Sequence, residues 1–236
     1  MKPLERKNYG SIPHLSNSKL GEGDYFVSEG QERILTIKKR DKHDHIYIFE
    51  KYDGSNIGIG KMNGKIFALT RSGYEAKTSP YKQHHYFSDW AYQNEKLFAE
   101  MLSEGERITG EWLMLAHGLR YKIVGDPILF FDYFTPKNER LLQIDMRKFL
   151  VNYGLNMPRL LHEGEPKSVI ELLPTLNLKT KGFESEENPE GMVFRVERKG
   201  MVDFLAKWVR SDFQNGKYCI GIEEPNLVWN TSPIWL

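Results

Sequence analysis

The chain has 236 residues, of which 40% are hydrophobic and 28% charged, and its formal net charge at pH 7 is +1. This length accommodates one substantial domain with at most a small appendage, and the near-neutral charge excludes a simple nucleic-acid coat protein, which would be more basic. No apolar run approaches the roughly 20 residues that cross a bilayer, so we expect no membrane partner. The single cysteine, Cys219, cannot form an internal disulfide, and no secretory leader is visible. These features predict an intracellular, cytoplasmic protein.

The N-terminal residues 1–30 are predicted to form an irregular arm, because glycine and proline interrupt them repeatedly. From about Glu32 the sequence becomes typical of strands. A first clear strand is predicted at 45–52, where isoleucines alternate with polar neighbours. The next two strands are expected to form a hairpin around Asn63-Gly64, the strongest short hairpin signal in the chain. The main domain is therefore expected to open as antiparallel sheet.

One long helix is predicted at Asp89–Ser103, with an acidic start, apolar residues at helical spacing and Gly105 as a stop signal. Shorter helices are expected at 145–153 and 167–173. Strand patterns return at 107–115, 127–134, 191–198 and 202–209. Antiparallel sheets with a few peripheral helices predict an α+β fold for one main domain, residues 31–236. The roughly 30 residues after Lys207 are too few for a second β-barrel domain.

The segment that carries chemistry is Glu50-Lys51-Tyr52-Asp53-Gly54-Ser55-Asn56. Taken alone, its K-x-D-G pattern is weak evidence, because a strand that ends in an Asp-Gly turn explains it equally well. Its weight comes from five further segments that follow it in order. They are Thr70–Gly73, Thr109–Trp112, Leu129–Phe134, Glu190–Arg195 and Ala206–Val209.

In this order the segments resemble the six motifs of the covalent nucleotidyltransferases, which comprise ATP-dependent DNA ligases, RNA ligases and mRNA-capping enzymes. The resemblance covers about residues 45–215 and implies the nucleotidyltransferase (adenylation) domain of that superfamily. It also implies ATP as the nucleotide donor and Mg²⁺ or Mn²⁺ as the metal. In such enzymes a lysine amine attacks the α-phosphorus of the nucleotide and expels pyrophosphate. The resemblance makes Lys51 that nucleophile.

The resemblance also implies roles for other residues. Lys51 and Lys207 are expected to be catalytic. The residues expected to bind the nucleotide are Glu50, Lys51, Asn56, Arg71, Glu111, Phe131 and Lys207. Weaker candidates for the site are Asp53, Asp132 and Arg210. Glu190 is expected to engage the metal. Arg71 would hold a phosphate or the ribose, and Glu111 a ribose hydroxyl. Phe131 would stack on the purine, because Phe130 and Phe131 must face opposite sides of a strand and only one of them can fill the core.

Two chemical details follow from the lysines. An ordinary lysine, with a pKa near 10.4, is neutral in only roughly one molecule in 2,500 at pH 7. We therefore expect the site to favour the free amine of Lys51 through cationic neighbours such as Lys207 and a bound metal.

Many members of the superfamily carry a second lysine where Val209 stands here. Two interpretations stay open: Arg210 replaces the missing cation, or the enzyme functions with one fewer.

The branch of the superfamily is indicated by Asn56, because DNA ligases and capping enzymes usually carry an arginine pattern there. The absence of a following OB-fold domain agrees with this. We expect an ATP-dependent RNA ligase that joins 3′-hydroxyl and 5′-phosphate ends of RNA or of a nicked duplex. An ATP-dependent DNA ligase, a capping enzyme and a non-catalytic end-binding module stay open as alternatives. The residues before Lys51, including Tyr9–Leu15, are expected to shape the adenine pocket or the nucleic-acid path.

Two other patterns carry no prediction of a site. Residues 58–65 resemble a phosphate-binding glycine loop but lack its spacing. The histidines of 42–45 and the pair His84-His85 lack partners at a metal-binding spacing, so we expect them in solvated loops.

Overall fold

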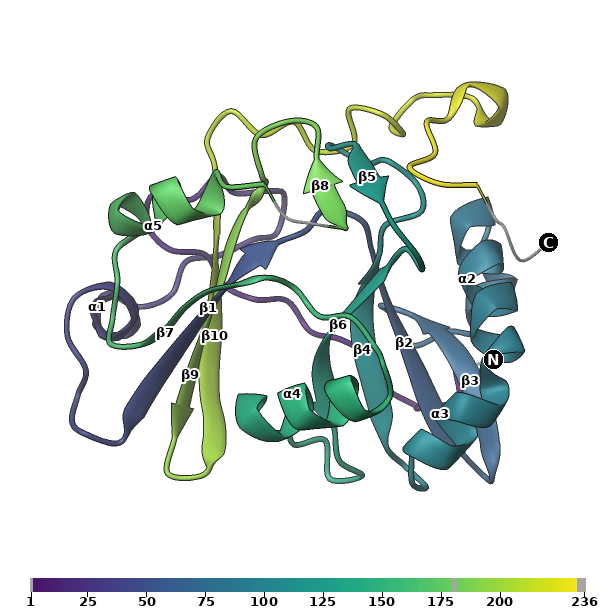
Figure 1. Cartoon of the computed structure of the whole chain (residues 1–236), viewed down its shortest axis with the longest axis horizontal. Coiled ribbons are helices and arrows are strands. Elements are labelled where there is room, and N and C mark those ends of the chain that lie inside the picture. Colours follow the sequence, from purple (N-terminus) through teal and green to yellow (C-terminus); the bar gives the residue numbers. More distant parts are fainter. Residues whose placement is uncertain (1, 180–181, 233–236) are drawn as a thin grey trace.

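The computed structural model describes residues 2–179 and 182–232, and it contains two four-stranded sheets side by side (Figure 1). The first sheet has the order β10-β9-β1-β7, and its strands are β1 (Asp44–Lys51), β7 (Leu160–Gly164), β9 (Gly191–Arg198) and β10 (Met201–Val209). The second has the order β3-β2-β4-β6, with β2 (Ser55–Met62), β3 (Lys65–Thr70), β4 (Arg107–Trp112) and β6 (Ile128–Phe134). A small pair joins β5 (Tyr121–Ile123) to β8 (Phe183–Ser185). Neighbouring strands within these sheets run antiparallel, which confirms the predicted α+β class.

The hairpin between β2 and β3 forms where it was predicted. Met62 pairs with Lys65, and both Asn63 and Gly64 have positive φ, at 52° and 71°. A two-residue turn with both central residues in this region matches the right-handed twist of the flanking strands. The turn therefore sets the register of the second sheet from local sequence alone.

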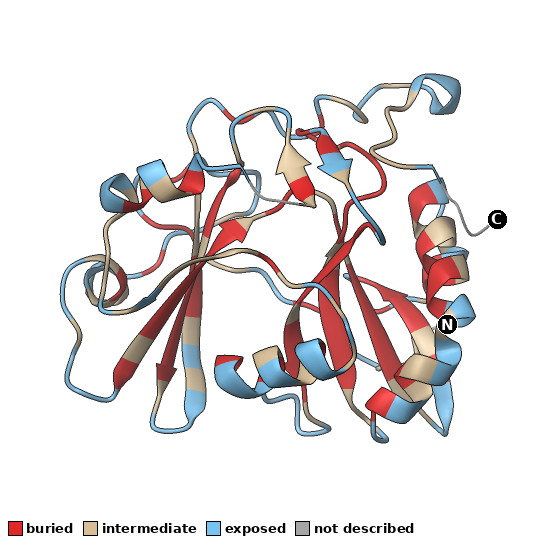
Figure 2. Cartoon of the chain, viewed as in Figure 1, coloured by how far each residue is buried: buried red, intermediate tan, exposed pale blue. Residues whose placement is uncertain are grey.

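Each sheet has its own apolar core, and buried residues concentrate along the central strands (Figure 2). One face of the second sheet packs on helices α2 (Lys82–Gln93), α3 (Glu95–Met101) and α4 (Gln143–Asn152). One face of the first sheet packs on α1 (Glu29–Thr36) and α5 (Val169–Leu176). Two short 3-10 turns lie at Ala76–Thr78 and Glu224–Asn226. Since each core takes up one face of its sheet, the opposite faces are free to line a site.

The expectation of strand structure from about Glu32 is wrong, because these residues belong to α1. Ser28 caps this helix: its hydroxyl accepts from the Gln31 backbone N–H, while the Gln31 side chain accepts from the Ser28 backbone. This is the S-x-x-Q capping box, which marks a helix start more strongly than the β-branched residues nearby mark a strand. The first strand begins only at Asp44.

The single helix predicted at Asp89–Ser103 is also wrong in its bounds, since two helices meet at Asn94. The Asn94 side-chain amide donates to the Trp90 carbonyl at 2.9 Å and so competes with the backbone pattern at that point. The first of the two helices starts earlier than expected, at Lys82, directly after Pro80 and Tyr81. The two shorter helices are confirmed as α4 and α5 within a few residues, whereas β5, β7 and β8 were not predicted.

The N-terminal arm lies beside the edge strand of the first sheet. The Lys207 N–H donates to the Pro13 carbonyl, and the Leu15 N–H donates to the Lys207 carbonyl, each at 2.9 Å. Further on, the Lys19 N–H donates to the Val209 carbonyl. The arm thus continues the sheet past β10. The division at residues 30 and 31 stays a prediction. Among the described residues after β10, there is no OB-fold. The helices in residues 2–179 and 182–232 are too short or too polar to span a membrane.

Candidate active site

A cavity of about 1020 Å³ opens between the two sheets, at the faces that their cores leave uncovered. It is lined from the first sheet by the ends of β1, β9 and β10, and from the second sheet by residues of β2, β3, β4 and β6. The N-terminal arm closes a third side. A space of this size is typical of sites for nucleotides and other small molecules.

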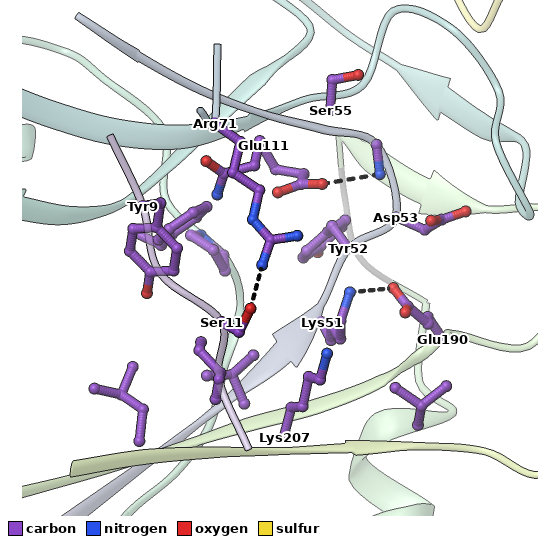
Figure 3. A pocket seen from close by; sticks show the side chains of 18 of the residues that line it. Tyr9, Ser11, Lys51, Tyr52, Asp53, Ser55, Arg71, Glu111, Glu190 and Lys207 are labelled. Atoms are coloured by element: carbon purple, nitrogen blue, oxygen red, sulfur yellow. Dashed lines mark hydrogen bonds and ion pairs between the residues drawn. The ribbon is translucent and has the colours of Figure 1, made fainter. Parts of the chain in front are cut away.

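Lys51 is the last residue of β1 and lines the cavity. Successive residues of a strand face opposite sides, so Lys51 shares the cavity face with Phe49, while Ile48 packs in the core of the first sheet. The Lys51 ammonium lies 2.6 Å from Glu190 Oε2, and a dashed line marks this ion pair in Figure 3. The Lys51 side chain is 22% exposed, which leaves it reachable from the cavity.

Two glycines allow this geometry. Gly191 pairs with Lys51 on β1 and with Val209 on β10. A Cβ atom on Gly191 would lie 1.9 Å from the Trp208 carbonyl oxygen, so only glycine permits the close approach that brings Glu190 over Lys51. A Cβ on Gly54 would similarly meet the Trp112 carbonyl oxygen at 2.4 Å. Both glycines belong to motif-like segments for this steric reason.

The charges around Lys51 differ from the sequence expectation. Burial acts to lower the pKa of the Lys51 ammonium, but the carboxylates of Glu190, Glu111 and Asp53 outweigh it and the net shift is upward. Burial raises the pKa of Glu190 to about 8 and that of Glu111 to about 7, although the Lys51 ammonium acts in the opposite direction. The protein groups alone therefore favour protonated Lys51, and the expectation of a free amine does not hold for them.

Lys207 reaches into the cavity from β10 toward Lys51 (Figure 3). Its pKa is lowered, first by burial and then by the charge of Lys51. Its side chain is 17% exposed and forms an ion pair with Asp24 of the arm at 3.3 Å. The structure thus brings together the two lysines that the sequence singled out, on neighbouring parts of one sheet.

The second sheet contributes polar groups. Asn56 and Glu111 face one another in register on β2 and β4. Glu111 Oε1 accepts from the Gly54 N–H at 3.1 Å, whereas the buried Asn56 Oδ1 has no hydrogen-bond partner among the described residues. Arg71 follows β3, lines the cavity and donates to Ser11 Oγ at 3.2 Å (Figure 3).

Asp53 organises the turn after Lys51 rather than pointing an open carboxylate into the cavity. It is 6% exposed, and its Oδ2 accepts from the Gly118 N–H at 2.5 Å. The Asp53 N–H donates to the Tyr121 hydroxyl at 2.9 Å. These contacts attach the loop before β5 to the turn that presents Lys51.

Phe130 and Phe131 face opposite sides of β6, as the alternation predicted. Phe130 is fully buried in the core of the second sheet, and Phe131 lines the cavity with its ring edge-on to Tyr9 at 5.2 Å between centroids. Asp132 is 1% exposed. Its carboxylate accepts from the Tyr9 hydroxyl at 2.6 Å and pairs with Arg195 at 2.7 Å, so its hydrogen-bonding capacity is used within the protein.

Two predicted residues have their charged groups engaged elsewhere. The Glu50 carboxylate accepts from Arg159 at 2.9 Å. Arg210 does not belong to the cavity lining, because its guanidinium donates to the Pro189 carbonyl at 3.0 Å and pairs with Asp212 at 2.8 Å. The geometry gives no support to Arg210 as the replacement cation.

The residues fit a metal of the magnesium type in one mode only. Across residues 2–179 and 182–232, no group of three His, Cys, Asp or Glu side chains could hold an ion. Mg²⁺ usually takes one or two carboxylates together with substrate phosphates and water, and Glu190 beside the cavity offers such a carboxylate.

His84 and His85 lie in the first turn of α2, not in a loop as expected.

Sequence reasoning expected Tyr9–Leu15 to shape the adenine pocket or the nucleic-acid path, but it did not identify Asp24 or the contacts by which the arm joins the cavity. Tyr9, His14 and Asp24 all line it. His14 and Asp24 contact each other and Asp24 contacts Lys207 across 183 positions of sequence. No motif spacing reports a contact over that distance. The only signal was indirect: the segment is longer than the predicted site requires.

Similarity to known proteins shows the family of this chain. The RNA ligase family model matches residues 44–209. No curated protein matches. Among solved structures, two forms of archaeal ATP-dependent RNA ligase are similar: form 2 with 21% identity and a TM-score of 0.50, and form 1 with 18% identity and a TM-score of 0.54. They cover 72% and 86% of this chain, which spans 44% and 48% of theirs.

A mutant RNA ligase of Naegleria gruberi with ATP and Mn has 16% identity and a TM-score of 0.52, covering 85% of this chain and 61% of its own. At these identities the solved structures show a shared fold, and the chain spans about half the length of the archaeal ligase chains in these two forms. The family match itself extends over most of the sequence and includes Lys51, Glu190 and Lys207. The chain therefore belongs to the RNA ligase family.

Proposed function

We propose that this protein is an ATP-dependent RNA ligase that joins 3′-hydroxyl and 5′-phosphate ends through an adenylate carried on Lys51. The observation that carries the proposal is the position of the Lys51 amine in a nucleotide-sized cavity, 2.6 Å from Glu190 and with Lys207 beside it. Membership of the RNA ligase family supports the same chemistry.

The first step is nucleotidyl transfer to Lys51. Its Nζ lone pair attacks the α-phosphorus of ATP, an N–P bond forms, the bond from that phosphorus to the pyrophosphate oxygen breaks, and the amine loses a proton. Lys207 projects its ammonium into the same space, where it can stabilise the negative charge that builds on the α-phosphate. On the opposite side, Phe131 offers a ring face for the adenine.

Before this attack, the Lys51 ammonium must lose its proton. Glu190, with a pKa raised by burial to about 8, is the nearest carboxylate and can share that proton. A divalent cation held by Glu190 would supply positive charge that favours the free amine and neutralises the phosphates. Asn56 and Glu111 lie on neighbouring strands as hydrogen-bonding groups for the ribose.

In the second step an oxygen of the 5′-phosphate attacks the adenylate phosphorus, the N–P bond breaks, and the Lys51 amine leaves with a proton, so that the nucleic-acid end carries AMP. In the third step the 3′-hydroxyl loses its proton and attacks the phosphorus of the 5′-phosphate, a phosphodiester bond forms, and the bond to AMP breaks. Both steps need positioning and charge stabilisation more than new reactive groups, so the same cavity serves all three. Arg71 stands at the edge of the cavity, where a guanidinium can hold the 5′-phosphate.

The test is incubation of the chain with ATP labelled at the α-phosphate, in the presence of Mg²⁺ or Mn²⁺. We expect a covalent protein–AMP adduct that acid cleaves, as a phosphoramidate requires, and that is absent in Lys51→Ala. Lys65→Ala is the matched control, because Lys65 is an exposed lysine at the start of β3 and lies outside the cavity lining. Adduct formation by Lys51→Ala would exclude Lys51 as the nucleophile.

Two further assays separate the alternatives. No adduct with either metal would favour an end-binding module, and an adduct with GTP instead of ATP would favour a capping enzyme. Nicked duplexes with RNA or DNA on each side of the break then define the ends. We expect sealing of nicks that contain RNA, and sealing of all-DNA nicks alone would indicate a DNA ligase.

A further inference from the structure

The N-terminal arm places a carboxylate in the cavity that, under the proposed function, binds the triphosphate of ATP. Asp24 lies in the cavity lining, with its side chain 23% exposed. A carboxylate near bound phosphates costs binding energy unless its charge is compensated. The position of Asp24 therefore needs a physical reason.

Asp24 belongs to a closed chain of hydrogen bonds that starts and ends on β10. The Val209 N–H donates to Ser18 Oγ at 2.8 Å, and Ser18 Oγ lies 2.6 Å from His14 Nδ1. His14 Nε2 lies 2.8 Å from Asp24 Oδ2, and the Lys207 ammonium lies 3.3 Å from Asp24 Oδ1. Each link joins a donor to an acceptor.

With a neutral His14 ring and an ionised Asp24, these contacts fit one arrangement of protons. Because Ser18 Oγ accepts from a backbone N–H, its own proton is available to His14 Nδ1. His14 is then the tautomer with its proton on Nε2, and this proton is donated to Asp24. Burial lowers the pKa of His14, which agrees with a neutral ring at pH 7. Asp24 is left with Oδ1 directed to Lys207.

The side chains in this chain of hydrogen bonds are also held in fixed positions. His14 is 1% exposed, and Asp24 Oδ2 accepts a second bond from the Gly21 N–H at 3.0 Å. Backbone bonds hold the arm to β10 at Lys207 itself and at Val209. A lysine side chain has several rotatable bonds, so such a rigid acceptor removes much of the freedom that Lys207 would otherwise have.

We propose that Asp24, oriented by Ser18 and His14, is a positioning residue that holds the Lys207 ammonium in the place where it meets the α-phosphate of ATP. The inference rests on the proposed function of the cavity. The arm is then part of the catalytic site, and the apparent conflict between a carboxylate and bound phosphates is resolved, because Asp24 directs a cation and is itself neutralised by it.

The first test is the kinetics of protein–AMP formation by Asp24→Asn. Loss of orientation of Lys207 should lower kcat on the order of 10- to 100-fold. Loss of a negative charge from the cavity should leave KM for ATP unchanged or lower. Glu22→Gln is the matched control, because Glu22 lines the same cavity, whereas the side-chain partner of Lys207 among the described residues is Asp24. It should keep kcat within about threefold. A raised KM with unchanged kcat in Asp24→Asn would overturn the proposal.

The second test is a double-mutant cycle with Lys207→Met. If Asp24 acts through Lys207, Asp24→Asn should cause no further loss of kcat once Lys207 is replaced. Independent effects that multiply would contradict the proposal. His14→Gln should reproduce part of the Asp24→Asn loss, and Asp24→Glu, which keeps the charge, should recover part of the activity.

The third test does not depend on catalysis. The lysines are reductively methylated with ¹³C-formaldehyde, and the NMR signal of Lys207 is assigned by its loss in Lys207→Arg. This signal should shift in Asp24→Asn and in His14→Gln but not in Glu22→Gln, and an unchanged signal would refute the contact. Because the measurement needs no ATP, it separates this inference from the proposed function, which fails if Lys51 carries no adenylate.

Discussion

The two sheets contribute different kinds of side chains to one cavity. The sheet of β1, β9 and β10 brings Lys51 and Lys207, with Glu190 directly before β9. These groups are titratable and largely buried. The sheet of β2, β3, β4 and β6 brings an amide, a carboxyl and an aromatic ring, together with the exposed Arg71. We infer that the first sheet carries out the transfer and the second recognises the nucleotide.

The difference extends to how firmly each group is held. Lys51, Gly191 and Val209 pair across three neighbouring strands, so the backbone ladder sets the position of the transfer groups. Arg71 lies in the turn after β3, and its guanidinium donates to Ser11 and Gly10 at 3.2 and 3.4 Å, which are long hydrogen bonds. A ligand can therefore displace Arg71 from its present partners more easily than it can displace Lys51.

Lys207→Met should have the largest effect on activity among the variants that distinguish the roles of the two sheets. It removes a cation from the developing charge on the α-phosphate, so kcat of protein–AMP formation should fall about 100-fold or more. Initial rates over a range of ATP concentrations measure this effect. Lys65→Met, outside the cavity, is the control. A change confined to KM would contradict the assignment of transfer chemistry to the first sheet.

Phe131→Ala should show the opposite pattern. Removing the ring face from the second sheet should raise KM for ATP by about fivefold to tenfold, with kcat changed much less, because stacking stabilises bound nucleotide and transition state alike. The same initial-rate assay distinguishes the two parameters. Phe131→Tyr keeps the ring and should behave as the original protein. If Phe131→Ala lowered kcat alone, the division between the sheets would not hold.

The buried carboxyls predict a stability that falls as pH rises. The pKa of Glu190 is raised to about 8 and that of Glu111 to about 7, so the folded protein binds more protons than the unfolded chain between their ordinary pKa of 4.5 and these raised values. The stabilisation is full below their ordinary pKa near 4.5 and is lost as pH rises through 7 and 8. His84, with a pKa lowered to about 4, has the opposite effect only below about 6.5.

The window from pH 6.5 to 8 therefore isolates the carboxyls. Urea unfolding should show the free energy of unfolding decreasing across it by on the order of 1 kcal/mol. Glu190→Gln cannot ionise and should flatten most of the slope, whereas Glu22→Gln should not. A stability that increases across this window in the original protein would show that the carboxyls are ionised from the start.

Arg210→Ala should have the smallest effect. Its guanidinium is engaged by Pro189 and Asp212 outside the cavity, so kcat and KM for ATP should each stay within about threefold of the original values. The adenylylation assay used for Lys207→Met measures both. A loss as large as that of Lys207→Met would restore Arg210 as the replacement cation.

Local sequence was sufficient for part of this protein. Asn63-Gly64 determined a hairpin, because its two residues accept positive φ. The alternation in β6 separated Phe130 from Phe131. The order of motif-like segments singled out Lys51, Glu190 and Lys207, which the fold brings together at one cavity. The helix at Glu29–Thr36 was missed although its capping box was present.

Tertiary structure alone decided which charges meet. The carboxylates around Lys51 come from separate strands and loops, and their combined field raises its pKa where the sequence predicted a free amine. Asp24 reaches Lys207 across 183 positions of chain. Periodicity and spacing describe neighbours within one element, whereas Coulomb interaction depends on distance in space, and only the folded backbone sets that distance.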